Sequence, residues 1–129
     1  MDVLGAKTGE DAFCSTNFQR TNSTSTVYII LDMPAAGVVS LYIKGEAETS
    51  NLLPHYDVFT LDIDSNNKLR NTSGSTSLIS WTKKTYSLSA GRHTLKLTYK
   101  KDNVAPFGDY SINDNGYDRF CIDDLEISW

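Results

Sequence analysis

The stretch RHTLKLTYKKD, residues 92–102, decides the fold of this chain. Its side chains alternate: residues 95, 97 and 99 are leucine, leucine and tyrosine, whereas residues 94, 96, 98 and 100 are threonine or lysine. Successive side chains of a β-strand point to opposite faces of a sheet, so this period of two predicts a strand with one dry and one wet face. Strands of that kind belong to antiparallel sheets that pack face to face.

Five further segments show the same character and are rich in valine, isoleucine, tyrosine, phenylalanine and threonine. They are residues 25–33, 37–47, 55–64, 77–88 and 119–128. Clusters of turn-forming residues separate them, and no window has the periodicity that an amphipathic helix requires. The pattern predicts an all-β fold, an antiparallel two-sheet β-sandwich, with a jelly roll as the best architecture.

The bulk properties bound the size and class of the protein. A chain of 129 residues with 40% hydrophobic and 22% charged residues predicts a single globular domain that spans residues 1–129. The net charge of -4 argues against nucleic acid as a partner, because phosphate binding needs a basic excess. No apolar run is long enough for a membrane span, so we expect no membrane insertion. The opening DVLGAKTGED is typical of a domain excised from a longer polypeptide.

Two cysteines, Cys14 and Cys121, lie near opposite ends of the chain. A disulfide between them would close a long loop and stabilise the fold by roughly 4 kcal/mol in the chain-entropy model. Buried free thiols are the alternative, since cysteine often serves as a small core residue. The sequence has no CxxC pair and no cysteine–histidine spacing typical of zinc, so neither residue indicates a redox or zinc site.

Two segments, residues 64–76 and 102–116, are too long and too polar to be simple hairpin turns. The second combines aromatic and acidic residues. Long loops at one end of a sandwich are usual places for function, and disorder is an equally plain alternative.

Residues 86–102, YSLSAGRHTLKLTYKKD, are followed after a loop by YDRFCIDDLEIS at 117–128. This run resembles the closing half of jelly-roll modules found in bacterial extracellular and phage tail proteins. The matching positions are Gly91, His93, Thr94, Leu95, Tyr99, Lys101, Asp102, Ile122, Asp123 and Asp124. Such modules resemble carbohydrate-binding modules. The resemblance implies a non-catalytic binding domain of a larger multidomain polypeptide that is extracellular, at the cell surface or part of a phage tail. Cys121 stands where a tryptophan is common, which departs from the pattern.

The closing strand raises a question, because Asp123, Asp124 and Glu126 lie among its apolar residues. In modules of this type a structural calcium ion often joins the first strand to the last. The resemblance therefore implies a calcium site, since calcium takes six to eight oxygen ligands. Its ligands would be Glu10 or Asp11 from one end of the chain and Asp123 or Asp124 from the other. The alternative needs no metal: Asp124 and Glu126 face solvent, and Asp123 accepts hydrogen bonds from its neighbours.

Sugar binding needs flat aromatic rings that stack on pyranose faces, beside polar groups that bond to the hydroxyls. The candidates are Tyr42, Trp81, Tyr86, Phe107, Tyr110 and Tyr117. Tyr42 alternates with apolar residues and shares its face with Lys44, which favours exposure, whereas the pattern around Trp81 leaves core and surface equally open. The last three aromatic residues lie in the second long loop. We expect a glycan site on an open sheet face or at the rim of this loop.

Together these features predict a non-catalytic carbohydrate-binding module of a larger surface-acting protein, whose partner is a polysaccharide or cell-surface glycan. A structural or protein-adhesion domain is the alternative, and it would show an apolar patch in place of a polar-rimmed aromatic surface. A small glycoside hydrolase or lyase is a third hypothesis, with Asp57 or Asp62 as the catalytic acid. The sequence offers it little support, because it has no HExxH or GxSxG motif, and His93 falls on the leucine face of its strand as a satisfied core or edge residue.

Overall fold

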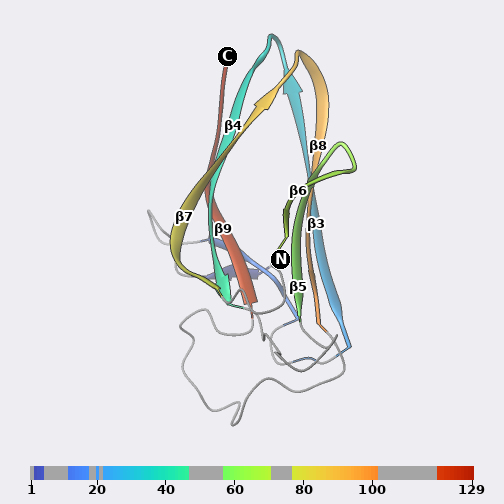
Figure 1. The fold of residues 1–129 in the computed structure, drawn as a ribbon, viewed down its shortest axis with the longest axis vertical. Helices are drawn as coiled ribbons and strands as arrows, with labels where there is room; N and C mark the ends of the chain where they lie inside the picture. The colour runs from blue at the N-terminus through green and yellow to red at the C-terminus, as the bar shows by residue number, and fades with distance from the viewer. Residues whose placement is uncertain are drawn as a thin grey trace.

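The computed structural model describes residues 2–4, 12–17, 20, 22–46, 57–70, 77–101 and 119–129. Within these ranges the chain forms β-strands and no helix (Figure 1). The strands are β1 (Asp2–Leu4), β2 (Ala12–Cys14), β3 (Thr24–Met33), β4 (Gly37–Glu46), β5 (Val58–Ile63), β6 (Asn66–Arg70), β7 (Ser77–Leu88), β8 (Gly91–Lys100) and β9 (Arg119–Ser128). The predicted all-β class is confirmed for the described part of the chain.

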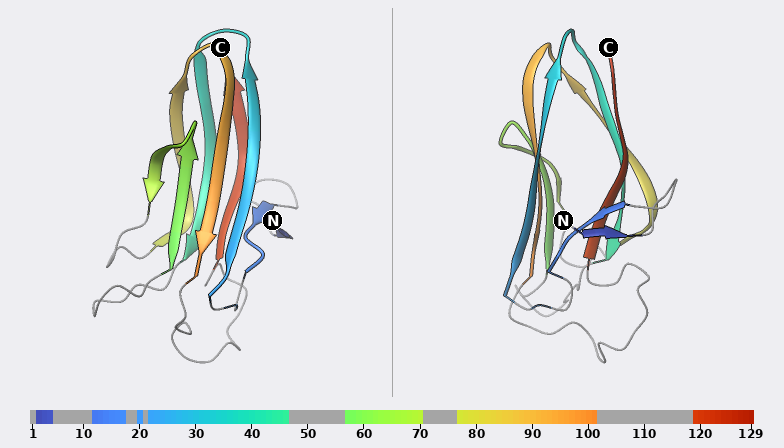
Figure 2. Two further views of the ribbon diagram at one scale, coloured as in Figure 1. Left: turned by 90° about the vertical axis from the view of Figure 1, so that its right-hand side faces the viewer. Right: turned by 180° about the vertical axis from the view of Figure 1, so that it is seen from behind.

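The strands form two sheets that face each other as the layers of a sandwich, which Figure 1 and Figure 2 show from three sides. The five-stranded sheet has the order β1-β2-β9-β4-β7, and the four-stranded sheet has the order β3-β8-β5-β6. From β2 to β9 this is the strand order of a jelly roll, because successive strands change sheet everywhere except at the β5–β6 hairpin. Strand β1 extends the first sheet beside β2. The predicted jelly-roll β-sandwich is confirmed.

The core lies between the sheets and is made by the alternation that the sequence predicts. In β8 the side chains of Leu95, Leu97 and Tyr99 are fully buried, while the residues between them are half-buried. Phe59 of β5 and Phe120 of β9 stack with ring centroids 4.2 Å apart, and the Tyr99 ring meets Phe120 edge-on at 5.3 Å. The two phenylalanines come from opposite layers, so this aromatic contact joins the two sheets.

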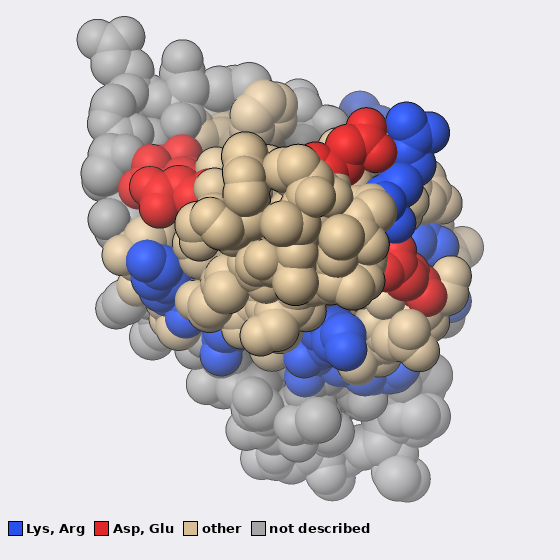
Figure 3. Space-filling view, turned by 90° about the horizontal axis from the view of Figure 1, so that it is seen from above, with Lys and Arg blue, Asp and Glu red and all other residues tan. Residues whose placement is uncertain are grey.

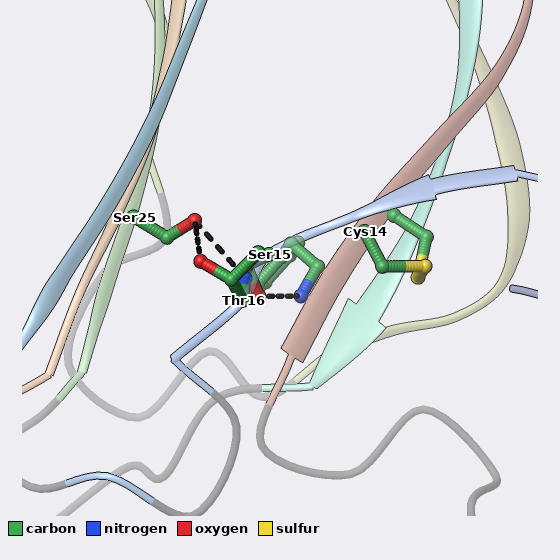
Figure 4. Close-up of a disulfide and its surroundings, with 6 residues drawn as sticks. Cys14, Ser15, Thr16 and Ser25 are labelled. Atoms are coloured by element: carbon green, nitrogen blue, oxygen red, sulfur yellow. Dashed lines mark hydrogen bonds between the residues drawn. A yellow bond between two sulfur atoms is a disulfide. The ribbon is translucent and has the colours of Figure 1, made fainter. Parts of the chain in front are cut away.

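Cys14 and Cys121 form a disulfide that fastens β2 to β9, so the disulfide alternative is correct and the free-thiol alternative is wrong (Figure 4). The chain then crosses from one sheet towards the other. The amide of Ser15 donates to a backbone carbonyl of β9 at 2.8 Å. The amide of Thr16 donates to Oγ of Ser25 in β3 at 3.0 Å (Figure 4). This short segment therefore connects the five-stranded sheet to the four-stranded sheet.

A β-bulge in β9 determines which acidic side chains of that strand lie on the outer face. On β4, Ser40 and Tyr42 are separated by one residue, whereas their partners on β9, Glu126 and Asp123, are separated by two. Between them lies Asp124, whose φ of 47° is in the left-handed region that aspartate tolerates. Asp123 and Glu126 therefore share the outer face. The expectation of solvent exposure holds for Glu126, which is exposed, whereas Asp124 lies at the bulge and is half-buried.

The end of the sandwich that carries the β3–β4 and β7–β8 turns is uncharged at its centre and surrounded by charged side chains (Figure 3). Residues 34–36 and 89–90 form these turns and are exposed. In the part of the chain that the structure describes, no helix is long and apolar enough to cross a membrane.

Candidate functional site

Two of the predicted aromatic residues, Tyr42 and Trp81, lie on the outer face of the five-stranded sheet. Tyr42 is in β4, where it alternates with the fully buried Leu41 and Ile43. Trp81 is in the neighbouring β7, and both rings are half-buried. The sequence left core and surface open for Trp81, and the structure places it on the outer face, where it meets a lysine of β4.

Two lysines lie over these rings in a crossed arrangement. Lys83 is the direct partner of Tyr42 in the β4–β7 ladder, and its Nζ lies 5.9 Å from the centre of the Tyr42 ring. The register of the ladder then shifts, and the Nζ of Lys44 lies 5.9 Å from the centre of the Trp81 ring. A cation at this distance is attracted to the face of an aromatic ring. We call Tyr42, Lys44, Trp81 and Lys83 the Tyr42–Trp81 platform.

A carboxylate completes a row of side chains across this face. Asp123 of β9 is the partner of Tyr42 on the side opposite to Lys83, so the order across three strands is acid, ring and base. Oδ1 of Asp123 accepts a hydrogen bond from the amide of Asp124 at 2.7 Å, which fixes the carboxylate. An aromatic ring between a hydrogen-bond acceptor and a donor can stack on a sugar while the polar groups bond to its hydroxyls.

Tyr86 lies on the opposite face of β7, so it is separated from the platform. It pairs with the fully buried Val39, and its ring packs against the hydrophobic core. Burial raises the pKa of its hydroxyl. The prediction of Tyr86 as a glycan-binding residue is therefore corrected to a role in packing. The three loop candidates, Phe107, Tyr110 and Tyr117, lie outside the described residues.

The predicted calcium site is described only in part. Glu10 and Asp11 lie outside the described residues, whereas Asp123 and Asp124 lie at the bulge of β9. Over the described ranges, no three His, Cys, Asp or Glu side chains are placed together to hold a metal ion. Two carboxylates fall short of the six to eight oxygens that calcium takes, so a calcium ion here would need further ligands from other residues.

The outer face of the four-stranded sheet carries a hollow that the sequence pattern did not reveal. It has a volume of about 530 Å³ and is lined by Tyr28, Asp62, Asp64, Ser65, Thr94 and Lys96. Tyr28 is 62% exposed in the middle of β3. The alternation of Tyr28 with Val27 and Ile29 was the sequence signal that could have placed Tyr28 on the outer face. It was weak because Ile30, on the same face as Tyr28, makes both faces of this strand read as apolar.

Three residues beside the hollow, Asp64, His93 and Ser89, follow the order of a catalytic triad, but their bonds are structural. Nδ1 of His93 lies 2.5 Å from Oδ2 of Asp64, and Nε2 lies 2.9 Å from the carbonyl oxygen of Ser89. Because both nitrogens face acceptors, first the Asp64 carboxylate and then the Ser89 carbonyl raise the pKa of His93. Nε2 of His93 also lies 3.4 Å from Oγ of Ser89, but its nearer partner is the Ser89 carbonyl oxygen, so that carbonyl and Asp64 orient the ring. The expectation that His93 is a satisfied residue is confirmed.

The two acids of the hydrolase hypothesis point to opposite sides of the four-stranded sheet. Asp57 is fully buried and accepts a hydrogen bond from the Tyr99 hydroxyl at 3.1 Å. Asp62 lies in the hollow and accepts from Nδ2 of Asn67 at 3.0 Å. A glycoside hydrolase needs two carboxylates that flank one bond of the substrate. Asp57 and Asp62 do not form such a pair.

The sequence matches no protein-family model and no curated protein. One similar solved structure is a family 35 carbohydrate binding module from an environmental isolate, with a TM-score of 0.42 and 13% identity over 99% of this chain and 88% of that chain. Another is CBM35 from Cellvibrio japonicus Abf62, with a TM-score of 0.41 and 14% identity over 98% of this chain and 87% of that chain. Similarity at this level carries no argument about function, and the jelly-roll assignment rests on the strand order of this chain.

Proposed function

We propose that this chain is a non-catalytic carbohydrate-binding module that recognises a glycan on the Tyr42–Trp81 platform. The observation that carries the proposal is the gathering of two aromatic rings, two ammonium groups and the carboxylate of Asp123 on one outer sheet face. Aromatic rings stack on the C–H faces of pyranose rings, and charged groups form the stronger hydrogen bonds to hydroxyls. The platform on β4 and β7, together with Asp123 on the neighbouring β9, offers both kinds of contact.

The platform is preformed, because its residues stand on paired strands. Strand β4 is bonded to β7 on one side and to β9 on the other. Binding then requires mainly that Lys44 and Lys83 turn from the aromatic rings to the hydroxyls of the sugar. A preformed site has a small entropic cost, but a shallow one makes few contacts, so we expect weak affinity that repeated binding units in the parent protein raise.

We propose that the module acts outside the cell, at a cell surface or in a phage tail, as one part of a larger protein. The disulfide between Cys14 and Cys121 supports this location. Disulfides persist in oxidising compartments and are rare in the reducing cytosol.

A structural or protein-adhesion role is the second candidate, and exposed apolar side chains favour it. Phe13, Tyr28, Ile30 and Trp129 are each more than half exposed. Among these four, only Tyr28 and Ile30 are neighbours on one strand face. Within the described residues, these two side chains form a pair and not a contiguous apolar patch of several hundred Å², so glycan binding is the better supported function.

A glycan array probed with the purified domain, with calcium and with chelator, tests the proposal. We expect binding to at least one glycan family, and we expect Trp81→Ala to weaken it at least about tenfold, or about 1.4 kcal/mol. Thr85→Ala is the matched control, because Thr85 is exposed on the same strand and the same face. The platform is refuted if Trp81→Ala and Thr85→Ala bind alike. Release of reducing sugar from a bound glycan would contradict the non-catalytic assignment.

A further inference from the structure

We infer that the hollow on the four-stranded sheet, here called the Tyr28 hollow, is a second carbohydrate site and that it takes a neutral sugar. Its lining residues come from β3, β5, β8 and the turn after β5. None of these elements belongs to the sheet that carries the Tyr42–Trp81 platform. The second site therefore stands on its own residues and goes beyond the proposed function.

One row of paired residues crosses all four strands and passes through the hollow. Tyr28 of β3 pairs with Lys96 of β8. Lys96 pairs with Asp62 of β5, and Asp62 pairs with Asn67 of β6. Residues paired in an antiparallel ladder point to the same face, so ring, ammonium, carboxylate and amide form a line about 14 Å long at roughly 4.8 Å per strand. Such a line presents a stacking surface followed by a donor and an acceptor, and Nδ2 of Asn67 holds the acceptor by donating to Oδ1 of Asp62 at 3.0 Å.

The aromatic end of this row is open to a ligand. The Tyr28 side chain is 62% exposed, although Nζ of Lys96 lies 5.7 Å from the centre of its ring. Tyr28 also lies on an edge strand, because β3 is the first strand of the four-stranded sheet. A sugar can therefore approach the ring from beyond the sheet edge while Lys96 donates to its hydroxyls.

The wall opposite the ring is held by hydrogen bonds. Asp64 and Ser65 form the turn after β5, with φ angles of 50° and 66°. Oδ1 of Asp64 accepts from the amide of Thr94 at 2.9 Å, and Oδ2 faces Nδ1 of His93 at 2.5 Å. The amide of Asp64 also donates to the carbonyl oxygen of Thr94 at 2.9 Å. Because both carboxylate oxygens and the backbone of Asp64 are engaged, the wall does not need to be ordered by the ligand.

The lining of the hollow places opposite charges on neighbouring strands, and this arrangement favours a neutral ligand. Of the two carboxylates in its lining, Asp62 lies opposite Lys96, and Asp64 is paired with His93 behind the wall. A sugar carboxylate drawn to Lys96 would lie one strand spacing from Asp62, and a sugar ammonium drawn to Asp62 would lie as close to Lys96, so repulsion by the group of like sign offsets the attraction in both cases. Hydroxyl groups can instead donate to Asp62 and accept from Lys96. The volume of about 530 Å³ lies within the range of small-molecule sites.

The test compares Tyr28→Ala with Ile30→Ala on neutral cello-, xylo-, manno- and galacto-oligosaccharides. The two side chains are a matched pair, because they lie on the same face of β3 and are 62% and 61% exposed. We expect Tyr28→Ala and Asp62→Asn each to lower the affinity for at least one neutral oligosaccharide tenfold or more, and Ile30→Ala to leave it within twofold. Equal binding by Tyr28→Ala and wild type across this set overturns the inference. Thermal melts of each variant verify that the fold is retained.

Trp81→Ala separates this inference from the proposed function. If the hollow is an independent site, binding that depends on Tyr28 persists in Trp81→Ala. If Trp81→Ala abolishes all binding and Tyr28→Ala abolishes none, the hollow is refuted and the platform stands, whereas the reverse result refutes the platform alone. Uronate-containing counterparts of the same oligosaccharides test the charge argument, since equal or tighter Tyr28-dependent binding of the acidic form overturns the neutral assignment.

Discussion

Reduction of the Cys14–Cys121 disulfide should destabilise the domain strongly, because the two residues are 107 positions apart. In the chain-entropy model, a loop of that length restricts the unfolded chain and stabilises the folded state by about 4.8 kcal/mol at 25 °C. Unfolding entropy is about 2.1 cal/mol/K per residue, or about 0.27 kcal/mol/K for this chain of 129 residues. The ratio of these two quantities gives an expected loss of about 18 °C in Tm.

Circular-dichroism melts of the oxidised and the reduced protein measure this loss, with a thiol titration to verify reduction. The double variant Cys14→Ala/Cys121→Ala is the control, since it should melt near the reduced protein and should not respond to reductant. A fully reduced wild type that melts within about 4 °C of the oxidised form would limit the contribution to about 1 kcal/mol. That result would refute the reasoning that the disulfide acts by closing a chain-spanning loop.

Three further outcomes are expected. Because its pKa is raised, His93 contributes stability that is complete below the ordinary pKa of 6.5 and is lost as pH rises through its folded pKa. Because its pKa is lowered, Asp64 contributes stability that is present above 3.8 and is lost as pH falls through its folded pKa. As pH rises above 6.5, the Tm of His93→Gln should therefore change less than the Tm of wild type. Phe120→Ala removes the ring stacked on Phe59 and should cost about 3 to 5 kcal/mol in urea unfolding, with a loss below about 1 kcal/mol contradicting the packing. A calcium ion bound at the bulge of β9 should raise Tm in wild type but not in Asp124→Asn, and a wild-type Tm that a chelator leaves unchanged argues against the metal.

The strands could be predicted from the sequence because their signal is local. In β8 the polarity of each side chain indicates the face on which it lies. The residues predicted to face the core, Leu95, Leu97 and Tyr99, are the buried ones. The same local alternation placed Tyr42 outward between Leu41 and Ile43. The signal needs only the covalent geometry of one extended strand, so it holds wherever the strand is regular.

The composition of the two sites could not be predicted, because it depends on pairing between distant segments. Nothing near Tyr42 in the chain indicates that Lys83 and Asp123 flank it, and nothing near Tyr28 indicates Lys96 as its partner. Bulges add a second obstacle, since one extra residue exchanges the faces of all residues beyond it. The bulge in β9 brings Asp123 to the outer face beside Glu126, which alternation alone did not predict. The side of Trp81 stayed open because both faces of its segment mix apolar and polar residues.

The two rows differ in the position of the aromatic ring, and this difference argues against a duplicated function. On the five-stranded sheet Tyr42 lies between Asp123 and Lys83, so a ligand stacked on it meets polar groups on both sides. On the four-stranded sheet Tyr28 lies at the edge and the polar groups lie on one side only, which suits the end or branch of a chain. Because the rows lie on opposite sheets, one glycan segment cannot occupy both by lying flat. Occupation of both sites would then join two glycan chains, and the gain in avidity would come from binding between chains and not along one chain.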